Sequence, residues 1–403
     1  MSHKIDADIV VVGAGLVGMA AAVACAKLGK KIVLVDSKKP NTQPKSTEPK
    51  STEAKSTALK KGWDERIYAL TTSTVAWLQA LEIWHDVDEN RVNDINAMQL
   101  WDEQGDKLVL QDSDANLANL GVIIENKNLH NALNQQMSEL GVTVITDATC
   151  DFLENSEQAI KLHLLDGCCI SAKLIVAADG VDSWLRGQVG IIVKIKDFKQ
   201  TAVVANFLAE KAHQNIARQW FAPHETLALL PLPHKHVSMV WALSTEQAAE
   251  LLTLSNAALA EKVQVRTHSE LGNLNMVGNA LSFTLQQQTA TQLIAPRMVL
   301  VGDAAHQIHP MAGQGMNLGL RDVRQLVDLL TNTHAMQDIG ETTFLRKYVR
   351  ARQADIATMN TLTSGLDALF ASNSEILKRA GTWGFKQLNQ QAKLKELLIK
   401  QAA

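Results

Sequence analysis

The sequence predicts an α/β protein. A nucleotide-binding domain is interrupted by an inserted, mainly antiparallel β-sheet domain and is followed by a C-terminal helical segment. Three observations lead to this prediction. A strand, a glycine turn, a helix and a second strand occur within the first 36 residues. Strand-like segments with few helices fill residues 200–285, and a second strand-then-glycine segment comes only at 298–303. The nucleotide-binding domain is therefore expected to be discontinuous.

Each regular element of the nucleotide-binding domain follows from its residue pattern. Residues 8–12 and 32–35 are apolar runs that predict buried strands, and the alanine-rich stretch at 16–28 between them predicts a helix. A further buried strand is expected at 174–178, and the chain is expected to be helical from residue 317 onward.

The expected domain boundaries follow from these changes of pattern. The nucleotide-binding domain is assigned to residues 1–72, 100–188 and 286–335, the substrate domain to 73–99 and 189–285, and the helical segment to 336–403. Residues 38–61 contain a lysine-, serine- and threonine-rich repeat of five residues with no apolar face, which predicts a flexible, low-complexity surface loop.

Composition limits the classes of function. The net charge of −3 gives no overall field that would attract nucleic acid, and no apolar stretch is long enough to span a bilayer. The first residues lack the pattern of a secretory signal. The four cysteines have no CxxC spacing, so we expect reduced thiols in a soluble, cytoplasmic protein.

The first motif is the glycine turn at Gly13, Ala14, Gly15 and Gly18. Gly13 allows a tight turn, Gly15 lets the backbone approach a pyrophosphate, and Gly18 lets helix and strand pack closely. Asp36 ends the second strand, where a carboxylate can accept hydrogen bonds from ribose hydroxyls. This arrangement indicates a dinucleotide, but it does not distinguish FAD from NAD.

Two later motifs are more specific. Residues 178–186 read Ala-Asp-Gly-Val-Asp-Ser-Trp-Leu-Arg, and the segment of 21 residues at 302–322 begins Gly-Asp-Ala-Ala-His and contains Gly-Gln-Gly-Met-Asn. With these motifs the chain resembles the FAD-dependent aromatic hydroxylases of the para-hydroxybenzoate hydroxylase fold. More narrowly, it resembles the ubiquinone-biosynthesis hydroxylase family. The resemblance covers nearly the whole chain and implies a Rossmann-like FAD-binding domain.

The third motif also makes physical sense beside a flavin. Asp303 at a strand end can bind a ribityl hydroxyl, and glycines let the backbone lie against a flat ring. A helix that starts near Gly315 would direct its N–H groups at the flavin edge that becomes negative on reduction. The expected cofactor-binding residues of this motif are Asp303, Gly313, Gln314, Gly315, Met316 and Asn317.

The resemblance implies further site residues. Asp179 and Gly180 of the second motif match positions that help hold the cofactor, and Arg66 and Asn126 match positions beside the FAD. A surface arginine is the alternative for Arg66.

Two histidines in the third motif need separate interpretation. For His306 we favour a structural hydrogen bond over a metal site, because no cluster of further ligands accompanies it and Pro310 interrupts the turn. The resemblance places His309 and Pro310 near the reactive side of the flavin, where they would shape the pocket.

The family's chemistry uses FAD, with NADPH or NADH as a transient reductant and dioxygen as the oxidant. Its substrate is a polyprenylated phenol, whose pocket wall we expect partly from 227–242, although most leucines there are expected to be core residues. The turn at 223–226 departs from the family pattern, which leaves substrate details open. No second GxGxxG is present for a separate nicotinamide domain. Alternatives are an epoxidase or prenyl reductase of the same fold, or a non-catalytic FAD-binding subunit.

The tail from Glu375 onward is basic, with six Lys or Arg against two Glu, and carries regularly spaced apolar residues. Such a helix fits an anionic membrane surface or a partner in a quinone-biosynthesis complex, and packing on its own domain is the alternative. A lipid-tailed substrate favours a peripheral position on the inner face of a membrane. The sequence does not indicate which ring carbon reacts, the tail length or the oligomeric state.

Overall fold

The computed structural model describes residues 4–38, 62–308, 314–334, 336–370 and 388–402. The first part of the molecule is built on a six-stranded sheet in the order β19–β20–β13–β2–β3–β9. The strands are β2 (Ile9–Val12), β3 (Ile32–Val35), β9 (Thr143–Ile145), β13 (Leu174–Ala177), β19 (Ile294–Ala295) and β20 (Met298–Leu300). The strands predicted from the apolar runs are confirmed. Their segments come from three distant parts of the chain, so this domain is discontinuous.

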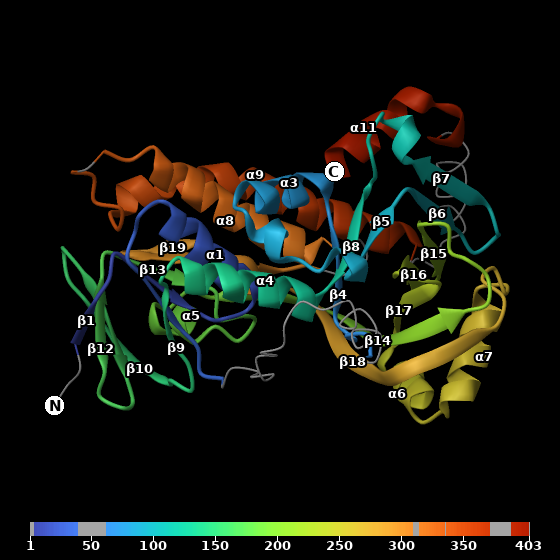
Figure 1. Ribbon diagram of the computed structural model, residues 1–403, viewed down its shortest axis with the longest axis horizontal. Coiled ribbons are helices and arrows are strands. Elements are labelled where there is room, and N and C mark those ends of the chain that lie inside the picture. Colours follow the sequence, from blue (N-terminus) through green and yellow to red (C-terminus); the bar gives the residue numbers. More distant parts are fainter. Residues whose placement is uncertain (1–3, 39–61, 309–313, 335, 371–387, 403) are drawn as a thin grey trace, which may run out of the picture.

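Helices cover this sheet (Figure 1). They are α1 (Leu16–Lys27), α4 (Asn126–Glu139), α5 (Trp184–Gln188), α8 (Gly315–Thr331) and α9 (Thr342–Phe370). A further helix, α3 (Thr72–Ala80), packs against α8 and β8. The helix predicted at 16–28 is confirmed, and α8 and α9 confirm the helical character predicted from 317 onward for the residues that they span. α1 packs against α4 and α8, and α8 packs against α9. The helical segment therefore begins as part of the main core, where α9 contributes Leu345 and Tyr348.

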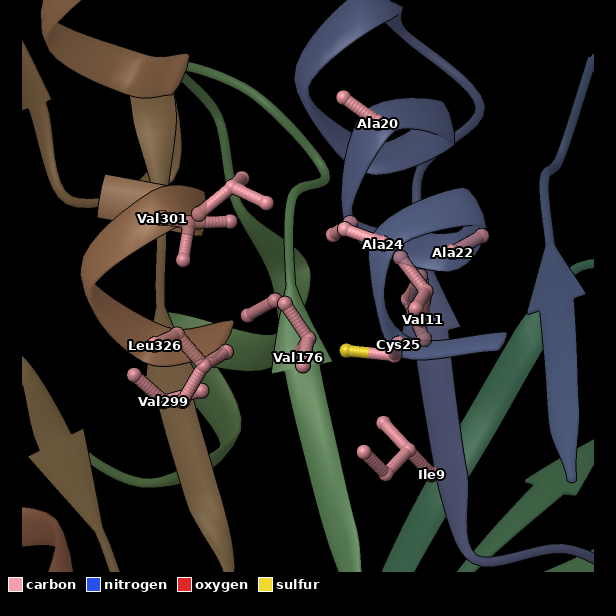
Figure 2. Packing of buried hydrophobic residues seen from close by; sticks show 14 of the residues in the cluster. Ile9, Val11, Ala20, Ala22, Ala24, Cys25, Val176, Val299, Val301 and Leu326 are labelled. Atoms are coloured by element: carbon pink, nitrogen blue, oxygen red, sulfur yellow. The ribbon is translucent and has the colours of Figure 1, made fainter. Parts of the chain in front are cut away.

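Figure 2 shows how closely α1 lies on the sheet. The sulfur of Cys25 on α1 points toward Val176 of β13, and the side chains of Ala20, Ala24 and Cys25 are fully buried. Alanine side chains keep the distance between helix and strand short, which brings the start of α1 close to the strand ends. Burial raises the pKa of the Cys25 thiol to about 12. All four cysteines are unpaired, as expected.

Two small sheets extend the first part. One has the order β1–β12–β11–β10, formed by β1 (Lys4–Asp6), β10 (Cys150–Asn155), β11 (Ile160–Leu164) and β12 (Cys169–Ala172). The other has the order β4–β8–β5, formed by β4 (Ile67–Leu70), β5 (Val92–Ile95) and β8 (Gly121–Glu125). The second of these lies between the two parts of the molecule (Figure 1).

The second part is an eight-stranded sheet in the order β21–β18–β14–β17–β16–β15–β6–β7. Its strands are β6 (Ala97–Trp101), β7 (Lys107–Gln111), β14 (Val193–Ala209), β15 (Ile216–Ala222), β16 (Glu225–Pro231), β17 (His236–Ser244), β18 (Leu274–Ala290) and β21 (His306–Gln307). All pairings are antiparallel except that of β15 with β6. Helices α6 (Thr245–Leu252) and α7 (Asn256–Arg266) pack on one face.

Two segments lie in a different part of the molecule than we expected. Residues 100–111 were assigned to the nucleotide-binding domain, but β6 and β7 belong to the eight-stranded sheet. Residues 73–87 were assigned to the substrate domain, but Leu78, Ile83 and Val87 are buried in the core of the first part. The reason is that β6 pairs with β15, far away in sequence, and such a pairing leaves no local pattern. The loop predicted at 38–61 lies almost wholly outside the described residues.

Candidate cofactor and active site

Three strand ends meet at one edge of the six-stranded sheet. Ala177, the last residue of β13, is the register partner of Val12 on one side and of Leu300 on the other. Because the three strands are parallel, the loops that follow them leave from the same edge, which is where ligands bind in open α/β sheets. These loops are the three glycine-containing motifs of the sequence, which therefore come together.

The glycines of the first motif differ in their surroundings. A side-chain carbon at Gly13 would lie 2.2 Å from the carbonyl oxygen of Ala178, and one at Gly18 would lie 1.9 Å from the carbonyl oxygen of Gly13. Gly13 also has a φ of 107°, which side chains disfavour. Both positions therefore require glycine. A carbon at Gly15 would meet nothing within 4 Å, so the backbone borders open space there.

Two helix amino termini are available for a cofactor. Gly15 is the N-cap of α1 and Gln314 is the N-cap of α8, and in neither case does a side chain of the cap accept a backbone N–H. The first turn of each helix also lacks acidic residues. Free N–H groups and the helix dipole favour negative charge. The residues at α1 thus fit a pyrophosphate, and those at α8 fit the electron-rich edge of a flavin.

Asp36 supports the glycine turn directly. Its carboxylate accepts the backbone N–H of Ala14 at 2.6 Å and that of Lys38 at 2.6 Å. The expected ribose contact is compatible with this geometry, since a carboxylate has further lone pairs for hydroxyl donors. That contact stays a prediction.

The third motif packs directly on the first. A side-chain carbon at Gly302 would lie 3.1 Å from Cγ1 of Val17, and one at Gly319 would lie 2.9 Å from Cγ2 of Val17. Val17 belongs to α1, so the glycines of the third motif let α8 and the loop after β20 approach the first motif. The two motifs share one surface.

Asp303 follows β20 at the same sheet edge. Its side chain is accessible to solvent, yet burial by the surrounding protein raises the pKa of its carboxyl. The carboxylate thus lies close to surrounding protein atoms and is still accessible from solvent. The position agrees with the predicted contact to a ribityl hydroxyl.

Asn317 is fixed by the protein itself. Its Oδ1 accepts the backbone N–H of Thr71 at 3.0 Å, and its Nδ2 donates to the carbonyl oxygen of Ala69 at 2.8 Å. It therefore joins α8 to the end of β4. Gly315 and Met316, also predicted for the cofactor, form the first turn of α8 and are half-buried. The predicted residues His309, Pro310 and Gly313 lie outside the described residues.

The second motif is held by its own side chains. The carboxylate of Asp179 accepts the hydroxyl of Ser183 at 2.6 Å and the N–H of Leu185 at 3.0 Å, which fixes the turn at Gly180 (φ 84°). Arg186 is buried and donates to the carbonyl oxygen of Ala304 at 2.9 Å. Arg186 thus ties the second motif to the third, while Asp179 shapes a loop in addition to its predicted cofactor role.

The segment around Arg66 is held by a buried carboxylate. Glu125 receives Arg91 through two N–H groups, at 2.5 and 2.6 Å, and accepts the N–H of Asp64 at 2.6 Å. The N–H of Asn126 donates to the carbonyl oxygen of Arg66 at 2.9 Å. The side chain of Arg66 is exposed and Asn126 begins α4, half-buried. Their contacts with FAD stay predictions.

A buried charged network lies behind the third motif. Asp322 is fully buried, and its carboxylate lies 2.6 Å from Nε2 of His306 and 2.6 Å from Nε of Arg352. It also accepts the N–H of Gly302 at 2.9 Å. Burial would raise the pKa of Asp322, but His306, Arg352 and the N–H of Gly302 outweigh it and lower that pKa. The network fixes the residue that precedes Asp303.

The structural role expected for His306 agrees with this contact. Within the described ranges, no group of three His, Cys, Asp or Glu side chains is placed to hold a metal ion. His309, the other histidine considered for a metal, is not among the described residues.

The eight-stranded sheet presents two different faces. The face under α6 and α7 carries Val203, Phe207, Leu227, Leu229, Met239 and Trp241. Because side chains alternate along a strand, Ala228, Leu230, Val240 and Ala242 lie on the opposite face. The expectation that most leucines near 227–242 are core residues is confirmed for Leu227 and Leu229. Only the alternate positions are available for a pocket wall.

Several residues that hold the site were not predicted. Arg186 and Asp322 are parts of the quoted motifs, but their partners Ala304 and Arg352 are far away in sequence. A charged residue at a buried helical position, such as Asp322 within the apolar pattern of α8, was the available signal. Arg352 had no comparable signal.

The fold and the site together define a dinucleotide-binding flavoprotein. A family model described as FAD binding domain matches residues 6–361, and the chain belongs to this family. It is an FAD-dependent monooxygenase, as the sequence predicted.

The relatives agree with this class. The chain is 29% identical over 401 residues to the ubiquinone hydroxylase UbiL of Rhodospirillum rubrum, covering 98% of this chain and 89% of that protein. It is 30% identical over 444 residues to human mitochondrial ubiquinone biosynthesis monooxygenase COQ6, covering 97% and 91%. It is 30% identical over 377 residues to 3-demethoxyubiquinol 3-hydroxylase of Escherichia coli, covering 92% and 90%.

Solved structures confirm the predicted fold. The p-nitrophenol 4-monooxygenase PnpA from Pseudomonas putida superimposes with a TM-score of 0.77 at 16% identity, over 99% of this chain and 98% of that one. At this identity the likeness concerns the fold alone.

Proposed function

We propose that the protein hydroxylates the aromatic ring of a polyprenylated phenol in ubiquinone biosynthesis, with FAD as cofactor, NADPH or NADH as reductant and dioxygen as oxidant. The convergence of the three motifs at one sheet edge carries the proposal, since it builds a site for a dinucleotide from distant segments. The relatives named for ubiquinone hydroxylation, each aligned over nearly its whole length, support the substrate class.

The chain's own residues have defined tasks in this reaction. The amino terminus of α1 at Gly15 would hold the pyrophosphate of FAD, Asp303 would hold the ribityl chain, and the first turn of α8 would stabilise negative charge on the ring. Bound FAD supplies hydride acceptance and oxygen activation. The apolar face of the eight-stranded sheet excludes water and orients the phenol.

The direct test is turnover by purified, FAD-loaded protein. We expect oxidation of NADPH or NADH to rise when a polyprenylated phenol is added, with one oxygen atom appearing on the ring. Lipid extracted from a strain that lacks the protein should contain the unhydroxylated precursor, which identifies the ring position. Failure to hydroxylate any such phenol, together with an unchanged lipid profile, would refute the proposal.

We also propose that the C-terminal helix rests on an anionic membrane surface. α11 (Ala392–Ala402) packs through Ile399, which is 5% exposed, and through an ion pair between Lys395 and Asp114 at 3.7 Å. One side of α11 therefore packs on the protein itself, as the alternative interpretation expected. On another side Leu397 and Leu398 are exposed. No helix in the described ranges has the length and apolar character needed to cross a bilayer.

Flotation with anionic vesicles tests this peripheral contact. Replacing Leu397 and Leu398 by Gln should reduce the vesicle-bound fraction, because the helix would lose its exposed apolar side. Replacing Leu140, which is also exposed and follows the end of α4, should not. Equal flotation of all three proteins would contradict the proposal.

A further inference from the structure

The face of the eight-stranded sheet opposite α6 and α7 contains a continuous apolar strip. Its members are cross-strand neighbours on one face, and we call them the apolar strip: Ala202, Val204, Ala228, Val240, Leu281 and Phe283. Leu281 pairs with Val204, which pairs with Val240, which in turn pairs with Ala228. Directly paired residues in a sheet point to the same side, so this row is unbroken across four strands.

The strip changes in character from the middle of the sheet to its edge. Ala202 and Val204 in the middle are small and buried. Leu281 and Phe283 on β18 are large, and their exposed fractions are 44% and 46%. Leu281 and Phe283 are two residues apart on one strand, so their side chains lie on the same face of the sheet and form an exposed apolar patch. Leaving such a patch in contact with water is unfavourable in free energy unless a ligand or another part of a protein covers it.

The strip is connected to the cofactor region and opens at a sheet edge. Gln288 and Thr289 near the end of β18 pair with Gln307 and His306 of the third motif, and Leu281 and Phe283 lie earlier on the same strand. Among the described strands, only β21 lies beyond β18, and its pairing is limited to that end. Leu281 and Phe283 therefore lie on the strand that reaches the third motif, at a part of its edge where no described strand pairs with it.

We infer that the apolar strip binds the polyprenyl tail of the substrate and that Leu281 and Phe283 are the residues over which the tail leaves the protein. This inference rests on the proposed function. A flexible chain of isoprene units needs an extended apolar surface with no polar partners, and small side chains in the middle leave room for its first units. The tail also covers the exposed patch on β18.

The test separates tail binding from ring chemistry. In the FAD-loaded protein, Leu281 and Phe283 are replaced together by Gln, and two phenols are compared, one with a long polyprenyl tail and one with a single isoprene unit. Binding without oxygen is followed through the flavin spectrum, and turnover is followed by product. We expect the dissociation constant and KM for the long-tailed phenol to rise about tenfold, because two apolar contacts are lost. Values for the short-tailed phenol should stay within about twofold.

A matched control comes from the other side of the sheet. Val265 on α7 is also exposed, at 72%. Its replacement by Gln should change neither the dissociation constant nor the KM of either phenol. Equal effects of the double substitution on both phenols, or no effect on either, would overturn the inference and leave the proposed function intact. The wild-type protein could also bind the long-tailed phenol and hydroxylate neither phenol. If the double variant then binds the long-tailed phenol more weakly, the proposed function is wrong and the tail site is supported.

Discussion

The cofactor edge differs in construction from the face of the eight-stranded sheet that lies opposite α6 and α7. At the cofactor edge, close backbone contacts determine which residues are allowed, because Gly13 and Gly18 have no space for a single extra carbon. On the sheet face, the volume and polarity of the side chain determine which residues are allowed, since Ala202, Ala228 and Val240 need only be small and apolar. Residue identity is therefore strictly constrained in the first region and loosely constrained in the second. The difference suggests that one cofactor can be retained while the substrate changes.

The largest effect is expected at Asp322, which supports the cofactor edge from behind. Asp322→Ala leaves Arg352 buried without its carboxylate partner, and we expect a loss of about 4 kcal/mol in the free energy of unfolding. Chemical denaturation measures this loss. Because the pKa of Asp322 is lowered in the folded protein, the stabilisation that its carboxylate provides is fully present above 3.8, the ordinary pKa of an aspartate in the unfolded chain. This stabilisation is lost as the pH falls through the lower pKa that Asp322 has in the folded protein. The difference in the free energy of unfolding between wild type and variant should therefore become smaller at such pH values.

The exposed ion pair between Lys27 and Glu82 serves as the control for this variant. Glu82→Ala should leave the denaturation midpoint almost unchanged, because solvent screens this pair. Similar losses for the two variants would show that burial of the network has no special importance.

A smaller effect separates folding from cofactor binding within the first motif. Gly15→Val adds a side chain to open space, so the protein should fold, but the pyrophosphate position is filled and FAD affinity should fall about 100-fold, or about 2.8 kcal/mol. Gly18→Ala adds one carbon 1.9 Å from a carbonyl oxygen and should instead destabilise the fold by about 3 kcal/mol. Thermal unfolding of apoprotein and FAD titration distinguish the two. Normal flavin occupancy in Gly15→Val would contradict the assignment of this motif.

The smallest effect concerns the sheet face. The double substitution of Leu281 and Phe283 should alter only the preference for tail length, without changing FAD retention or unfolding. If it released FAD, the two regions would not be independent, and the comparison would fail.

Sequence reasoning succeeded where the backbone constrains residue identity. The turn at Gly13 and Gly18, the acid at Asp36 and the strand before Asp303 were predicted because few other residues satisfy such geometry. Prediction from the sequence failed where a partner far away in the chain determines the position of a segment. The alternation of Leu227 and Ala228 predicts two faces, but it does not say which of them the helices cover. The parallel pairing of β6 with β15 likewise leaves no mark in either strand.

The order of the strands in the central sheet has a consequence for how the protein is made. β13 pairs with β2, which is synthesised first, and with β20, which is synthesised more than a hundred residues later. The ribosome must therefore release every strand of the inserted sheet except β21 before β20 and α8 can complete the flavin edge. Tyr348 and Arg352, which hold the carbonyl oxygen of Leu300 and the carboxylate of Asp322, emerge later still. The nascent chain is thus expected to acquire FAD only near the end of translation, and loss of the segment beyond residue 340 should yield a colourless protein.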